Sequence, residues 1–117
     1  SNPNFLRDYA NEFDYIAMDF KTTNYEKYLN FSDEIIKESL NILKNAKTPY
    51  EIRMTMYPPY IKEENMESIA EILEGIDKVF LQEYKPVEFG SQEIYSLPIL
   101  EKFKNILVKN GVNVEIR

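Results

Sequence analysis

The sequence predicts an α/β protein in which four parallel strands alternate with helices in a sequential β/α repeat. Apolar, strand-like segments begin near residues 15, 50, 79 and 112, and amphipathic helical segments separate them. The strand starts lie about 30 to 35 residues apart, which is the length of one strand and one crossover helix. Because such crossovers are right-handed, we expect strands in sequential parallel order, as in a four-stranded fragment of a β/α barrel or half of a doubly wound sheet.

The first half of the sequence predicts two helices and one strand. Apolar residues spaced at three and four predict a helix over residues 3–13. A continuous apolar run over residues 15–18, continued by residues 19–21, is typical of a parallel strand covered on both faces, and residues 22–30 are interpreted as a loop. A second helix, over residues 32–45, begins with Ser32 as its N-cap. Its buried stripe is formed by Ile35, Ile36, Leu40 and Leu43.

The second half of the sequence continues the same alternation. Residues 50–57 predict a strand that ends before two prolines, and residues 62–74 predict the third helix. Residues 78–84 predict the third strand, residues 96–110 the fourth helix and residues 112–116 the last strand. Two glycines suit the left-handed position that follows a helix, Gly75 and Gly111.

The composition describes one domain with restricted chemistry. The 117 residues suit a single domain, and the net charge of −6 disfavours binding to nucleic acid. No apolar run approaches the roughly 18 residues that span a bilayer, so we expect no membrane segment; without a visible leader we expect a cytoplasmic protein. The chain contains no cysteine and no histidine. We therefore expect no metal ligands and no histidine-dependent catalysis within this chain.

Polar side chains recur near the carboxyl ends of three predicted strands. They are Asp19 and Lys21, Arg53 and Thr55, and Gln82 and Lys85. In parallel α/β proteins, ligands bind beyond these strand ends, so the recurrence indicates a binding site. Asp19 and Lys21 lie two residues apart and share a strand face, where they form either a structural ion pair or part of the site.

Arg53 and Gln82 each allow a structural and a functional interpretation. A guanidinium inside a strand must reach solvent or a carboxylate, because a buried unpaired charge is costly. A carboxylate or phosphate of a ligand satisfies Arg53, and so does Glu51. Gln82 shares a strand face with Phe80 and Tyr84, where its amide binds either an adenine or ribose or a backbone carbonyl. The nine tyrosines are interpreted mostly as amphipathic residues at the edges of elements.

Three segments together carry a resemblance to a known family. They are residues 14–23 (DYIAMDFKTT), 50–58 (YEIRMTMYP) and 80–86 (FLQEYKP). In order and spacing they resemble the C-terminal half of radical S-adenosylmethionine activating enzymes. The likeness is greatest to anaerobic ribonucleoside-triphosphate reductase activating proteins, and pyruvate formate-lyase activating enzymes come next. It extends from Asp14 to Arg117, which is nearly the whole chain.

The resemblance implies a fold, a cofactor and a reaction. The implied fold is a four-stranded fragment of an open, partial TIM-like barrel, the radical SAM barrel. The residues that it places at S-adenosylmethionine, the last two beside the adenosyl group, are Asp19, Lys21, Arg53, Thr55, Gln82 and Lys85. In this family a 4Fe-4S cluster cleaves the cofactor reductively, and the 5′-deoxyadenosyl radical takes a hydrogen atom from a glycine of a partner enzyme.

The resemblance also implies partners and a further half of the protein. The family's Cys-x3-Cys-x2-Cys motif, which holds the cluster, lies in the N-terminal half, and this chain has no cysteine. We therefore interpret residues 1–117 as the C-terminal part of an activase, inactive alone and without a tightly bound cofactor. The expected partners are a glycyl-radical enzyme, with anaerobic ribonucleotide reductase first, and a reductant such as flavodoxin or ferredoxin. Exposed sheet edges favour self-association of this chain.

Two alternatives stay open at the level of sequence. One is a non-catalytic α/β interaction domain, whose polar strand ends only satisfy one another. An Arg53 side chain locked against Glu51, with no open cleft at the carboxyl ends of the strands, favours that alternative. The other is a radical enzyme of the same type that acts on a different substrate, such as pyruvate formate-lyase or a modified nucleoside.

Overall fold

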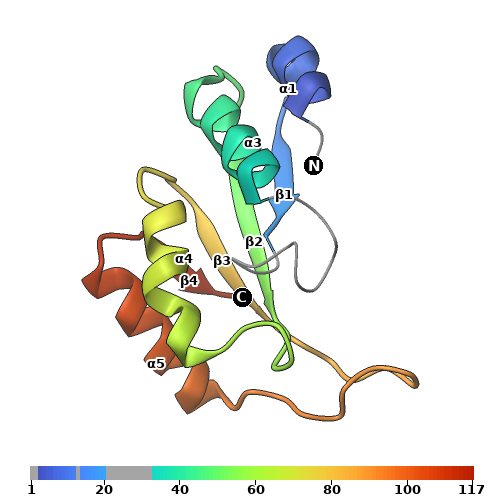
Figure 1. Ribbon diagram of the computed structural model, residues 1–117, viewed down its shortest axis with the longest axis vertical. Coiled ribbons are helices and arrows are strands. Elements are labelled where there is room, and N and C mark those ends of the chain that lie inside the picture. Colours follow the sequence, from blue (N-terminus) through green and yellow to red (C-terminus); the bar gives the residue numbers. More distant parts are fainter. Residues whose placement is uncertain (1–2, 13, 21–32) are drawn as a thin grey trace.

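Four strands alternate with helices along the chain (Figure 1). The structure is a computed structural model, and it describes residues 3–12, 14–20 and 33–117. In chain order the elements are α1 (Pro3–Tyr9), the 3₁₀ turn η1 (Ala10–Glu12), β1 (Ile16–Asp19), α3 (Asp33–Asn45), β2 (Tyr50–Met56), the 3₁₀ turn η2 (Glu63–Asn65), α4 (Met66–Ile72), β3 (Val79–Glu83), α5 (Leu97–Lys109) and β4 (Val114–Ile116). Among the described residues, no helix has the length and apolar character that crossing a bilayer requires.

The four strands form one parallel sheet in the order β1-β2-β3-β4, which confirms the predicted fold class and strand order. Each pair of neighbouring strands is joined through a helix, as right-handed crossovers require. The register places Asp19 opposite Arg53, and Thr55 opposite Gln82. These polar residues therefore gather at one end of the sheet. Within the described part of the chain, β1 and β4 each have a single strand neighbour and form the two edges.

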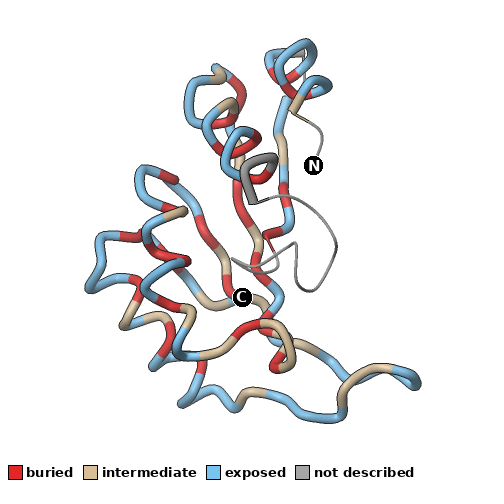
Figure 2. The backbone as a smooth tube through the Cα atoms, viewed as in Figure 1, coloured by how far each residue is buried: buried red, intermediate tan, exposed pale blue. Residues whose placement is uncertain are grey.

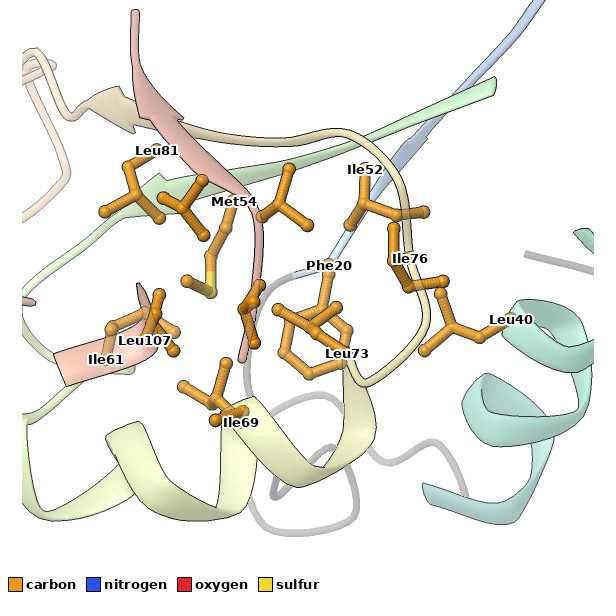
Figure 3. Packing of buried hydrophobic residues seen from close by; sticks show 14 of the residues in the cluster. Phe20, Leu40, Ile52, Met54, Ile61, Ile69, Leu73, Ile76, Leu81 and Leu107 are labelled. Carbon is orange, nitrogen blue, oxygen red and sulfur yellow. The ribbon is translucent and has the colours of Figure 1, made fainter. Parts of the chain in front are cut away.

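The hydrophobic core lies between one face of the sheet and the helices α3, α4 and α5 (Figure 3). Ile52, Met54 and Met56 alternate along β2 and are fully buried on this face. The helices meet them with apolar side chains that include Leu40, Ile69, Leu73 and Leu107. Each fully buried side chain of this size contributes about 1.5–3 kcal/mol to stability, so this face holds the domain together.

The opposite face of the sheet is polar, and α3, α4 and α5 do not cover it. Along β2 it carries Glu51, Arg53 and Thr55, of which Arg53 is half-buried and Thr55 exposed. Figure 2 shows buried stretches alternating with less buried ones along the sheet. On β3 it carries Phe80 and Gln82, both partly exposed. Parallel sheets are usually covered on both faces. Here the helices cover one face of the parallel sheet and leave the other face polar. A segment of a β/α barrel has this arrangement, because the face without helices lines the inside of the barrel.

The predicted elements differ from the observed ones mainly at their ends. The third helix, predicted over residues 62–74, begins as a 3₁₀ turn because the side chain of Asn65 accepts a hydrogen bond from the Lys62 backbone N–H at 3.0 Å. The predicted helix terminators are confirmed, since Gly75 and Gly111 have φ angles of 83° and 89°. The predicted loop 22–30 and the cap Ser32 lie outside the described residues.

Candidate functional site

A pocket of about 350 Å³ opens at the carboxyl ends of β1, β2 and β3. Its volume falls in the range of small-molecule sites. Its lining comes from the three strand ends and from the loops after β2 and β3, and consists of Asp19, Thr55, Tyr57, Tyr60, Tyr84, Val87 and Gly90. Two of the residues predicted at the strand ends, Asp19 and Thr55, therefore line a common pocket.

Arg53 reaches across the β1–β2 ladder to Asp19. Its Nε lies 3.2 Å from the Asp19 carboxylate, and the two side chains are 35% and 56% exposed. The Nε atom is shielded from solvent, and it makes no aligned hydrogen bond to any described residue. The contact is thus a Coulombic pair that leaves hydrogen-bonding capacity on the guanidinium. Arg53 itself does not line the pocket and is connected to it through Asp19, which does.

Glu51, the rival partner that the sequence offered for Arg53, is engaged elsewhere. It accepts a hydrogen bond from the Tyr15 hydroxyl at 2.7 Å and one from Arg117 at 2.8 Å. The Tyr15 hydrogen bond and the Arg117 guanidinium lower the pKa of Glu51, although its burial opposes them. The same hydrogen bond raises the pKa of Tyr15. Arg53 is therefore not locked against Glu51, and an open pocket lies at the strand ends, in contrast to the features that favoured an interaction domain.

The remaining predicted residues lie in different places. Gln82 is half-buried on the same sheet face as Arg53 and Thr55, opposite Thr55 in register, but it does not line the pocket. Lys85 is exposed and does not line the pocket either. Lys21 lies outside the described residues. Of the residues predicted from the sequence, two thus line the pocket and two are close neighbours of them.

Three tyrosines that the sequence interpretation assigned to element edges form the aromatic wall of the pocket. The ring of Tyr57 packs edge-on against Tyr60 and Tyr84, with centroids 4.9 and 4.6 Å apart. Their placement follows from strand alternation. Tyr57 continues the face of Thr55 beyond β2, and Tyr84 continues the face of Gln82 beyond β3. This period of two was the available signal for both residues.

Residues 85–96, here called the strap, form the irregular connection from β3 to α5 and lie along the pocket. Ser91 fastens the strap, because its backbone N–H donates to the Tyr57 hydroxyl at 3.2 Å and its carbonyl accepts from the Tyr84 hydroxyl at 2.9 Å. Gly90 permits this approach, since a Cβ at that position would overlap the Tyr84 hydroxyl. The pocket wall and the strap are therefore one hydrogen-bonded unit.

The described part of the chain shows no candidate metal site. No group of three or more acidic, cysteine or histidine side chains gathers there in a way that could hold a metal ion. The full sequence contains no cysteine or histidine. The chemistry available at the pocket is therefore that of a carboxylate, a guanidinium, hydroxyl groups and aromatic rings.

No protein-family model matches the chain. The chain is 30% identical over 118 aligned residues to a protein from Methanocaldococcus jannaschii that is named a glycyl-radical enzyme activating enzyme. The alignment covers 89% of this chain and 49% of the relative, so the chain spans about half the length of the curated relative that it matches. The similarity is therefore to one part of that relative.

Two solved structures share the fold. A domain of a pyruvate-formate lyase-activating enzyme from Bacteroides vulgatus superimposes with a TM-score of 0.74 at 19% identity, covering 95% of this chain and 72% of that one. A radical SAM methyltransferase from Sphaerobacter thermophilus gives 0.75 at 17% identity, covering 98% of this chain and 37% of that one. At these identities the matches establish the fold, which is a fragment of a partial TIM-like barrel.

Proposed function

We propose that the chain is the S-adenosylmethionine-binding, C-terminal part of a radical SAM enzyme that activates a glycyl-radical enzyme. The observation that carries the proposal is the Asp19–Arg53 pair at the edge of the pocket formed by the strand ends. Ligands of β/α barrels bind at this end of the strands. The similarity to an activating enzyme over 89% of this chain supports the same assignment.

The groups at the pocket fit the chemistry of S-adenosylmethionine. Arg53 offers a guanidinium to the cofactor's carboxylate, and Asp19 offers a carboxylate to its positively charged amine or sulfonium. Thr55 in the pocket lining offers a hydroxyl to the ribose or the adenine, and Gln82, opposite Thr55 in register but outside the lining, offers an amide beside it. We assign these four residues to cofactor binding, and Lys21 and Lys85 to its margin. When bound, and given one electron by a reductant outside this chain, the cofactor would supply a radical that removes a hydrogen atom from the substrate.

An iron–sulfur cluster does not fit the residues of this chain. Its usual ligands are cysteine thiolates, and the sequence has none. We therefore assign no step of cofactor cleavage to these residues. Their role is to hold and orient S-adenosylmethionine, while cluster ligands would come from the half of the relative that this chain does not match. On this basis the chain alone is inactive and binds the cofactor weakly.

The finer assignment is activation of anaerobic ribonucleotide reductase, with electrons from a flavodoxin or ferredoxin. The segments DYIAMDFKTT, YEIRMTMYP and FLQEYKP support it, because their likeness to that activase is greater than to the pyruvate formate-lyase activase. The name of the M. jannaschii relative specifies a glycyl-radical enzyme without saying which one.

The first test is the coding sequence directly upstream of this chain. We expect a Cys-x3-Cys-x2-Cys motif there, and its absence rejects the assignment. The second test is an anaerobic assay of the longer protein, reconstituted with iron and sulfide, on anaerobic ribonucleotide reductase. Electron paramagnetic resonance should detect a glycyl radical that depends on S-adenosylmethionine. If the glycyl radical forms on pyruvate formate-lyase and not on anaerobic ribonucleotide reductase, the chain still belongs to an activase, but the assignment to the reductase is wrong.

A further inference from the structure

The strap carries the most exposed of the large hydrophobic residues in the described part of the chain. Phe89 is 95% exposed, and Val87 and Ile94 on the same segment are 62% and 51% exposed. A single exposed apolar residue on a protein surface is ordinary. Three of them on one short connection, one of them an aromatic ring almost wholly in solvent, exceed that ordinary case.

The strap is also held in place at several points. Two tyrosine hydroxyls bind the backbone of Ser91 from both its N–H and its carbonyl side. At the far end of the strap, the Tyr95 hydroxyl donates to the Ile61 carbonyl at 2.6 Å, and the Tyr95 ring packs edge-on against Phe103 at 4.9 Å. A segment fixed in this way loses less conformational entropy on binding than a free loop does. Phe89 is thus an exposed anchor on a preorganised support.

The position of the strap relates this anchor to the pocket. Val87 and Gly90 line the pocket, whereas Phe89 between them does not. Figure 1 shows the strap, in orange, extending beyond the carboxyl ends of β2 and β3 toward the side of the sheet on which β1 lies. A small molecule in the pocket would contact Val87 and Gly90 and leave Phe89 in solvent. The partner of Phe89 is therefore larger than the pocket's ligand and sits over its rim.

Charge identifies the class of this partner. Glu88 and Glu93 are exposed on the strap, Glu83 precedes it, and Lys85 is its one cation. With a net charge of −6 for the chain as well, the surface repels nucleic acid and anionic membranes. An aromatic anchor flanked by carboxylates fits a protein surface that offers an apolar pocket with a basic rim.

We propose that the strap is the docking site for the protein substrate of the proposed activase. Phe89 inserts into an apolar pocket of that protein, and Glu88 and Glu93 face basic side chains around it. Docking at this point brings the substrate protein to the rim of the cofactor pocket, where its reacting residue must enter. The inference rests on the proposed function, because that function supplies the protein substrate.

Biolayer interferometry tests the proposal with this chain as the analyte. The immobilised probe is the anaerobic ribonucleotide reductase encoded in the same genome, with the pyruvate formate-lyase of that genome as the second probe. We expect Phe89→Ala to weaken binding by about tenfold or more, as for an interface hot spot. Val108→Ala is the matched control, because Val108 is 49% exposed on α5, away from the pocket lining, and its loss should change binding less than about twofold.

The outcomes separate this proposal from the proposed function. If the wild-type chain binds a probe and Phe89→Ala binds it with the same affinity, the docking site is wrong and the proposed function stands. Absence of wild-type binding to either probe counts against the proposed function and the docking site together. A photo-crosslinking residue at position 89 adds a second measurement in the longer protein. A crosslink to the probe supports docking, whereas a crosslink only within the longer protein shows that its other half covers Phe89 and overturns the proposal.

Discussion

Arg53 on β2 lies directly across the parallel ladder from Asp19 on β1, and its Nε is 3.2 Å from the Asp19 carboxylate. The pair is partly exposed, so solvent screens it, and such pairs contribute about 0–1 kcal/mol to stability. Its position at the pocket edge points to binding as its main role.

The first prediction concerns the stability of the Arg53 variant. We expect Arg53→Ala to change the free energy of unfolding by about 1 kcal/mol or less, because the lost ion pair is screened. Urea denaturation followed by circular dichroism measures this change. A loss of about 3 kcal/mol or more would mean that the pair is a structural element of the fold, as the interaction-domain alternative requires.

The second prediction concerns the neighbouring residue on the other face of β2. Met54 is fully buried against the helices, so Met54→Ala should cost about 2–5 kcal/mol from lost transfer energy and the cavity left behind. Thr55→Ala is the matched control on the polar face, where Thr55 is exposed, and it should cost about 0.5 kcal/mol or less. The same urea titration compares them. Equal costs would contradict the assignment of core face and polar face.

The third prediction concerns the pH dependence that Glu51 gives to stability. The Tyr15 hydrogen bond lowers the pKa of Glu51 in the folded chain below its ordinary value of 4.5. A lowered folded pKa means that the stabilisation is present above pH 4.5 and is lost as the pH falls through the folded pKa. The stability difference between wild type and Glu51→Gln should therefore be largest near neutral pH and shrink in acid.

Glu115→Gln is the control for this comparison of the free energy of unfolding with that of the wild type. Glu115 is an exposed carboxylate on β4, and no ion pair to another described residue involves it. Because Glu115 makes no such ion pair, Glu115→Gln should change the free energy of unfolding by about 0.5 kcal/mol or less at neutral pH. A Glu51→Gln difference that stays constant, or grows in acid, would contradict a lowered pKa of Glu51 in the folded chain.

The fourth prediction concerns the attachment of the strap. In Gly90→Ala the new Cβ displaces the Tyr84 hydroxyl, which donates to the Ser91 carbonyl, so the strap keeps only the hydrogen bond from the Ser91 N–H to the Tyr57 hydroxyl and opens more often. We expect faster hydrogen exchange at the Ser91 amide with helix and core amides unchanged. Gly111→Ala is the control, because its φ of 89° strains the chain at the end of α5 and nothing lies near the new Cβ. Equal hydrogen-exchange rates of the Ser91 amide in both variants would contradict the attachment of the strap by the hydroxyls of Tyr57 and Tyr84.

The alternation of apolar and polar residues was sufficient to predict the fold. The two faces of β2 follow from its period of two, and Gly75 marks a helix end because it has to adopt a positive φ. The start of the third helix was less predictable, since the Asn65 side chain competes for the backbone there and favours a 3₁₀ turn.

The candidate site was only partly predictable. Asp19 and Thr55 lie at strand ends, where topology alone brings them together. The choice of Asp19 over Glu51 as the partner of Arg53 depends on the register between β1 and β2, which sequence pattern does not fix. The clamp of Tyr57 and Tyr84 on Ser91 depends on the path of an irregular segment, for which no periodic signal exists.

The most direct test of cofactor binding is a nuclear magnetic resonance titration of the isotope-labelled chain with S-adenosylmethionine. Because part of the ligand shell is absent, we expect weak binding, with a dissociation constant of about 1 to 10 mM. Amide shifts should be confined to the strand ends at Asp19, Arg53, Thr55 and Gln82 and to the pocket wall, and Arg53→Ala should reduce them. An absence of shifts at ~10 mM cofactor, or shifts at the amino ends of the strands instead, would contradict the central claim.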